Sequence, residues 1–246
     1  MFPISVSVPT RFPPLVTYAL IAANAFIFLL QLGLSERAGE VAAFTYGLVP
    51  ARYSNPEWAL RVGLDPHDYW PFLTNTFMHG GWLHLILNMW TLWLFGPSVE
   101  DRLGAMRYLL FYLVCGVAAS AAHAWMNADS MIPAVGASGA IAGVLGAHMR
   151  LFPLSNVVVL IPILFIPFFF TLPSFFYIGI WFVMQILQGV GSAMMPEAGG
   201  IAWWAHIGGF LVGVVIGPLL CCSPRTYRRH YGDEGVLGFK PRGERR

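Results

Sequence analysis

Six long apolar stretches dominate the hydrophobic pattern of the chain. Each has about the 20 residues that a helix needs to cross a bilayer, and they lie near residues 13–34, 79–97, 106–126, 136–152, 173–190 and 200–222. The pattern predicts an all-α, polytopic membrane protein with six transmembrane helices. The first stretch has some features of a signal peptide, but its apolar part is too long and no A-x-A cleavage pattern follows, which favours a retained first span.

Two segments do not fit simple turns between helices. Residues 35–72 are polar, rich in prolines and aromatic residues, and far too long for a tight helical turn. We expect them to form a structured element at the membrane interface and not a separate domain. Residues 157–190 would extend about 50 Å as one helix, which exceeds the bilayer thickness. Prolines break this run, so we expect an extended or re-entrant connection over residues 157–170, followed by the fifth span.

Composition agrees with this class. Of the 246 residues, 57% are hydrophobic and 11% are charged, against about 25% charged in soluble domains. A soluble enzyme and a disordered chain are excluded, and three cysteines do not make a disulfide scaffold. The net charge of +2 is too small to indicate a nucleic-acid partner.

Basic residues are distributed unevenly between the two predicted sides of the membrane. With six spans, both termini lie on one side with most of the 14 Lys and Arg residues, and the opposite side has only Arg37, Arg52 and Arg61. Cytoplasmic loops are enriched in Lys and Arg. We therefore expect residues 1–222 to form the membrane domain, with its first loop outside, and residues 223–246 to form a basic cytoplasmic tail.

The second apolar stretch contains two polar side chains at helical spacing. His84 and Asn88 are four residues apart, which places them on one face of a helix. An ionisable or amide group at membrane depth is costly and is therefore a functional candidate. The alternative is that the pair only joins neighbouring helices through hydrogen bonds.

Ser138 lies between Gly136 and Gly139 at the start of the fourth stretch. A serine in this setting has an open approach, and free backbone N–H groups at a helix N-terminus can receive a developing oxyanion. The alternative is a face of small residues for helix packing, which Gly143 and Gly146 extend.

The sixth stretch places His206 beside glycines at intervals of four, Gly209, Gly213 and Gly217. Such a stripe allows close packing of helices. If it meets the glycines of the fourth stretch, the two backbones approach closely enough for His206 to reach Ser138, as in a Ser–His dyad. Both residues, and the polar pair of the second stretch, are expected at similar depth near the outer surface.

These segments, taken in order, resemble the rhomboid family of intramembrane serine proteases over nearly the whole chain. The matching segments are 79–88, 95–104, 136–139 and 205–213. The resemblance implies that Ser138 is the nucleophile and His206 the general base. It also implies an oxyanion site built from His84, Asn88 and the Ser138 backbone N–H, and a first loop half embedded in the outer leaflet of a bacterial inner membrane.

Two positions depart from the family's pattern. Trp70 is followed by Pro71, where many relatives have Arg, and Ala142 stands where some relatives have an aromatic residue that stacks on the base. These two departures bear on the anchoring of the first loop at Pro71 and on the support of His206.

The sequence thus predicts a serine endopeptidase that cleaves transmembrane segments of other membrane proteins near the outer face, without metal or cofactor. Its expected partners are transmembrane protein substrates and the lipid bilayer. The leading alternative is a non-catalytic relative that binds or escorts membrane proteins, but such relatives lack the serine, the histidine or both. A transporter or channel is disfavoured because the polar cluster is confined to the outer half of the membrane, where water can reach it without a path through the protein. A metal or haem site is disfavoured because no two of His79, His123 and His148 share a usable ligand spacing.

Overall fold

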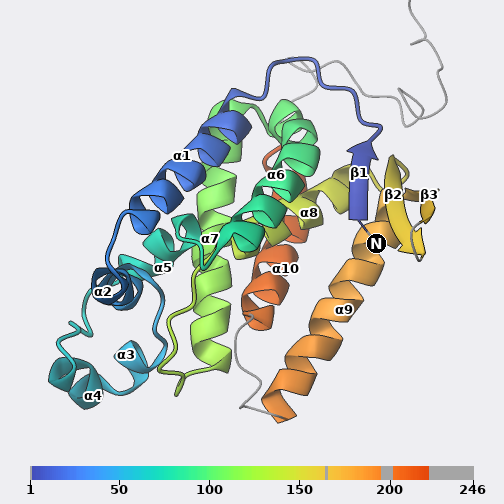
Figure 1. Cartoon of the computed structure of the whole chain (residues 1–246). Coiled ribbons are helices and arrows are strands. Elements are labelled where there is room, and N and C mark those ends of the chain that lie inside the picture. The colour runs from blue at the N-terminus through green and yellow to red at the C-terminus, as the bar shows by residue number, and fades with distance from the viewer. Residues whose placement is uncertain (1, 164–165, 195–201, 222–246) are drawn as a thin grey trace, which may run out of the picture.

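Long helices form the main body of the protein (Figure 1). The computed structural model describes residues 2–163, 166–194 and 202–221. Within these residues the six long helices are α1 (Leu15–Leu32), α6 (Trp82–Leu103), α7 (Ala105–Met126), α8 (Ser138–Leu151), α9 (Ser174–Met194) and α10 (Trp203–Leu219). Each overlaps one of the six predicted apolar stretches. Length and apolar composition alone suffice for α1, α7 and α9 to cross a membrane. The helical, polytopic class is therefore confirmed, and the predicted tail at residues 223–246 lies outside the described residues.

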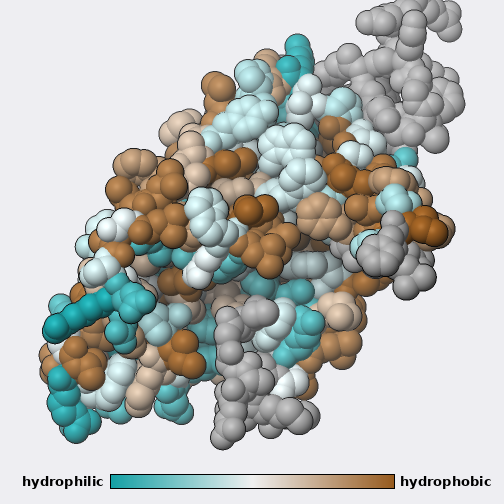
Figure 2. All heavy atoms as spheres, in the orientation of Figure 1, coloured by the Kyte–Doolittle hydropathy of each residue, from teal (hydrophilic) through white to brown (hydrophobic). Residues whose placement is uncertain are grey.

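The outer surface of the helices is apolar. Phe26, Leu29 and Leu30 of α1 are 61%, 58% and 57% exposed, and Figure 2 shows hydrophobic residues over this side of the molecule, with hydrophilic residues gathered toward the end that carries the first loop. Monomeric soluble proteins rarely expose large contiguous apolar patches. This surface fits contact with lipid.

The central helix is α8, in which every residue from Gly139 to His148 is buried. It meets α10 backbone to backbone. A Cβ atom added at Gly209 would overlap the carbonyl group of Gly139, and one added at Gly213 would overlap the carbonyl group of Gly143. The predicted contact between the two glycine stripes is therefore present, and it brings the first turns of α8 and α10 together.

Carboxylates of α6 fix the start of α1. Glu100 accepts hydrogen bonds from the backbone N–H and the hydroxyl of Thr17, both at 2.7 Å, and Asp101 accepts one from the backbone N–H of Arg11 at 3.0 Å. The first N–H groups of a helix have no intrahelical acceptor and carry its positive dipole end. The start of α1 and the end of α6 consequently lie at the same end of the bundle.

A small antiparallel sheet follows α8. β2 (Asn156–Ile163) pairs with β3 (Ile166–Pro173), with Val159 opposite Phe170. The expectation of an extended connection is confirmed, and α9 begins directly after β3. The sheet has the order β1-β2-β3 because β1 (Phe2–Val6) also pairs with β2. β1 was not expected from the sequence, because five residues are too few to show a clear alternation of apolar and polar positions.

The first loop is folded into short helices, as expected for a structured element. They are α2 (Glu36–Tyr46), α3 (Ala51–Ser54), α4 (Pro56–Arg61), α5 (Pro71–Thr74) and the 3-10 helix η1 (Asn75–Phe77). In Figure 1, α2, α3 and α4 lie together at one end of the bundle.

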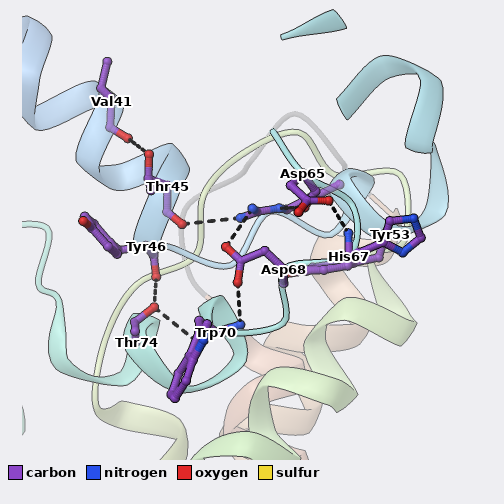
Figure 3. A network of polar contacts seen from close by, with 10 residues as sticks. Val41, Thr45, Tyr46, Tyr53, Asp65, His67, Asp68, Trp70 and Thr74 are labelled. Carbon is purple, nitrogen blue, oxygen red and sulfur yellow. Dashed lines mark hydrogen bonds and ion pairs between the residues drawn. The ribbon is translucent and has the colours of Figure 1, made fainter. Parts of the chain in front are cut away.

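Arg52 is buried and holds this loop together. Figure 3 shows the surrounding network of polar contacts, in which Asp65, Asp68 and Trp70 are labelled. Its guanidinium group donates to the backbone carbonyl of Asp65 at 2.7 Å and pairs with the Asp68 carboxylate at 2.9 Å. Asp68 in turn accepts a hydrogen bond from the backbone N–H of Trp70 at 3.0 Å. Arg52 therefore anchors the segment just before Pro71. Pro71 is the position at which many relatives have an arginine.

Candidate active site

Ser138 and His206 are in hydrogen-bond contact. The distance from Ser138 Oγ to His206 Nε2 is 2.7 Å, within the range required of a nucleophile and its base. Ser138 is the first residue of α8, and His206 lies in the first turn of α10. The close glycine packing of the two helices brings these residues together across 68 positions of the sequence, as the sequence predicts.

The other side of the His206 ring is held by α9 and by the start of α10. Gln185 Oε1 lies 2.7 Å from His206 Nδ1. The rings of Trp181 and Trp203 lie 6.1 and 6.0 Å from the imidazole, the second edge-on. Aromatic contact with the histidine therefore comes from α9 and α10, whereas Ala142 of α8 supplies none.

Gln185 was not predicted from the sequence as a site residue. It is an amide in the middle of an apolar helix. A polar group at membrane depth is costly, so Gln185 is a functional candidate for the same reason as His84 and Asn88. Gln185 belongs to no recognised motif, so its contact with His206 could not be predicted from the sequence.

His84 packs against the backbone beside the serine. A Cβ atom added at Gly136 would lie 2.7 Å from His84 Cε1 and 2.8 Å from His84 Nε2. Gly136 also has φ +137°, a conformation that residues with a side chain rarely adopt. Gly136 thus lets the His84 ring approach the segment that leads into Ser138.

Asn88 lies one turn further along α6, on the same face as His84. Its side chain is 8% exposed, and its Nδ2 group has no hydrogen-bond partner among the described residues. The backbone N–H of Ser138 also lacks an intrahelical acceptor, because Ser138 is the first residue of α8. Both groups are donors suited to an anion.

The first loop closes against the connection between α7 and α8. Leu48 and Ala134 exchange backbone hydrogen bonds of 2.9 and 2.8 Å, and the Gly136 N–H donates to the Asn75 carbonyl at 2.9 Å. Beneath this contact lies a cavity of about 20 Å³, which is large enough for one water molecule. Its lining includes Asn75, Gly136, Ser138 and two polar side chains of α7, Ser120 and His123.

Two further histidines, His148 and His79, make polar contacts with residues other than Ser138 and His206. His148, at the far end of α8, is fully buried and contacts Ser98 at 2.8 Å and Ser174 at 3.1 Å, so it joins α6, α8 and α9. His79 is 2% exposed, and its backbone exchanges hydrogen bonds with the amide of Gln31. Within residues 2–163, 166–194 and 202–221, no three His, Cys, Asp or Glu residues form a group that could hold a metal ion.

Taken together, these features define a polytopic helical membrane protein with a serine–histidine pair at one end of its bundle. Comparison with known proteins agrees. The sequence-family model of the Rhomboid domain matches residues 66–223. The chain therefore belongs to the rhomboid family.

Individual relatives are moderately similar. RHOMBOID-like protein 4 of Arabidopsis thaliana is 32% identical over 168 residues, which cover 66% of this chain and 36% of the relative. Presenilin-associated rhomboid-like protein, mitochondrial, of Bos taurus is 31% identical over 204 residues, 79% of this chain and 46% of the relative. Rhomboid protease GluP of Bacillus subtilis is 42% identical over 80 residues, 32% of this chain and 15% of the relative. The chain thus matches less than half of the length of each.

Proposed function

We propose that this protein is an intramembrane serine endopeptidase that cleaves transmembrane segments of other membrane proteins near the outer face. The observation that carries the proposal is the 2.7 Å contact between Ser138 Oγ and His206 Nε2. Family membership and the similarity to a relative named as a protease support the same reaction class.

In the first half of the reaction, His206 Nε2 takes the Ser138 proton while Oγ bonds to the carbonyl carbon of the scissile peptide. The carbonyl oxygen becomes an oxyanion, which accepts hydrogen bonds from the Ser138 N–H, His84 and Asn88. His206 then gives its proton to the leaving nitrogen, the C–N bond breaks and an acyl ester remains on Ser138.

In the second half, water attacks this ester and His206 Nε2 takes a proton from the water. The bond between Ser138 Oγ and the carbonyl carbon breaks, and the proton returns to Oγ. The cavity of about 20 Å³ beside Ser138 is a suitable place for the attacking water. Every step uses groups of this chain and water.

For orientation, we infer six spans with both termini in the cytoplasm, as in a bacterial inner membrane. Arg11 and the end of α6 lie together, and the Arg107 guanidinium donates to the Leu220 carbonyl at 3.4 Å beside the end of α10. Ser138 and His206 lie at the starts of α8 and α10, at the opposite end. The uneven distribution of basic residues supports placing the active site on the outer side.

Cleavage of a model transmembrane substrate with a small residue before the scissile bond tests this function. Ser138→Ala and His206→Ala should each abolish cleavage, and the double variant should be no worse than either, because the two residues act as a unit. A wild-type protein that binds the substrate and leaves it intact would favour the non-catalytic alternative.

A further inference from the structure

Within the described part of α9, Gln185 is the only side chain that forms a hydrogen bond with His206. It is 6% exposed, although the other face of the same helix exposes apolar side chains such as Val183 and Leu187. Its neighbours on the same face hold it in place: the Phe182 ring stacks on Phe210 of α10 at 4.1 Å, and Gly189 lies against Trp203 and Ile207.

The orientation of the Gln185 amide follows from its second hydrogen bond. Gln185 Nε2 donates to the backbone carbonyl of Trp181 at 3.3 Å. A carbonyl oxygen can only accept, so the NH₂ group must face Trp181 and the Oε1 atom must face His206. Since Oε1 is also only an acceptor, His206 Nδ1 must carry a proton.

This proton determines the chemistry at the other ring nitrogen. A neutral imidazole has one N–H and one free lone pair. With the proton on Nδ1, the lone pair lies on Nε2, which is 2.7 Å from Ser138 Oγ. His206 is then ready to accept the serine proton.

We propose that Gln185 is a positioning residue that holds His206 in the Nδ1–H tautomer and aims its Nε2 lone pair at Ser138; its effect on turnover rests on the proposed function. A third group that orients the base is a general feature of nucleophile–base pairs. A neutral amide supplies this orientation without placing a carboxylate at membrane depth, where charge is costly.

The tautomer is tested by NMR of the full-length protein with ¹⁵N-labelled histidine in detergent. His206→Ala identifies the His206 signal among the seven histidines. At a pH where the ring is neutral, wild-type His206 should be protonated at Nδ1, whereas Gln185→Met should lose this preference. A wild-type signal protonated at Nε2, or a Gln185→Met signal identical to wild type, would overturn the inference. This result does not depend on whether the protein cleaves anything.

Kinetics supply the second test, with Gln188→Met as the matched control. Gln188 lies on the same helix and is exposed. Gln185→Met should lower kcat about 10²-fold, the effect expected when a reacting group is misplaced. KM should be unchanged, because Gln185 does not contact substrate in the proposed mechanism, and Gln188→Met should resemble wild type.

A conservative variant separates positioning from packing. Gln185→Glu keeps an oxygen acceptor of the same reach and should retain more of kcat than Gln185→Met. Equal kcat in Gln185→Met and wild type, or equal losses in Gln185→Met and Gln185→Glu, would contradict the positioning role. Absence of cleavage by the wild type, with His206 protonated at Nδ1, would instead refute the proposed function and leave the tautomer assignment in place.

Discussion

Gly136 and His84 lie in direct contact, with no room for a side chain between them. A Cβ atom at Gly136 would lie 2.7 Å from His84 Cε1 and 3.7 Å from Ser138 Oγ. The glycine also has a positive φ angle of +137°. Because Gly136 has no side chain, the candidate oxyanion donor His84 can lie close to the candidate nucleophile Ser138.

Gly136→Ala is consequently expected to reduce turnover strongly. The added methyl group must displace His84, and a residue with a side chain held at this φ angle adds about 1–3 kcal/mol of backbone strain. Turnover of a transmembrane substrate and the thermal midpoint should be measured in the same detergent. Gly39→Ala is the control, because a Cβ atom at Gly39 in α2 meets nothing within 4 Å. Wild-type turnover in Gly136→Ala would show that the position of His84 is unimportant.

His84 and Asn88 should act mainly on the transition state. Removing one oxyanion donor typically costs about 10²–10³-fold in rate, or roughly 3–4 kcal/mol. We expect Asn88→Ala to lower kcat with little change in KM or thermal midpoint, and His84→Ala to have a larger effect. Residual activity is expected because the other donors remain.

The competing role of these two residues is helix packing, which has a different signature. An interhelical hydrogen bond in a membrane protein contributes about 0.6–2 kcal/mol to stability. A large fall in thermal midpoint with normal turnover at a permissive temperature would assign both residues to packing. Asn88 has no partner for its Nδ2 group among the described residues, which favours the transition-state role.

Arg52 should stabilise the first loop. Arg52→Met removes the donor to the Asp65 carbonyl and to Asp68 Oδ2, and unsatisfied partly buried groups cost about 1–3 kcal/mol. The thermal midpoint should fall. Arg61→Met removes an exposed basic residue of the same loop and serves as the control. Equal midpoints for the two variants would contradict the anchoring role.

Much of this fold follows from apolar segment length. A helix that crosses a bilayer must be long and apolar, so the six long helices could be located from the sequence. The prolines at 162, 167 and 173 correctly indicated the extended segment before α9. The pairing of β1 with β2 could not be predicted, because it joins Phe2–Val6 to residues more than 150 positions away.

Some contacts of the functional residues could likewise be predicted from the sequence, and others could not. The contact between Ser138 and His206 was predictable because two glycine stripes pointed to close helix packing. Gln185 and Arg52 were not, because a single polar residue shows that it needs a partner but not which partner. Their partners, His206 and the segment Asp65–Asp68, depend on tertiary packing.

The orientation of the protein can be tested with reporters. A reporter fused after Arg246 should be cytoplasmic, and one inserted near Asn55 in the first loop should be outside, because most basic residues sort to the side of the termini. A C-terminal reporter on the outer side would contradict the six-span arrangement.

Labelling of the purified protein by a serine-reactive fluorophosphonate tests the central claim most directly. The wild type should be labelled because His206 activates Ser138, and both Ser138→Ala and His206→Ala should lose the label, whereas Gln188→Met should keep it. Failure of the wild type to react, or equal labelling of Ser138→Ala, would contradict the assignment of Ser138 as the nucleophile.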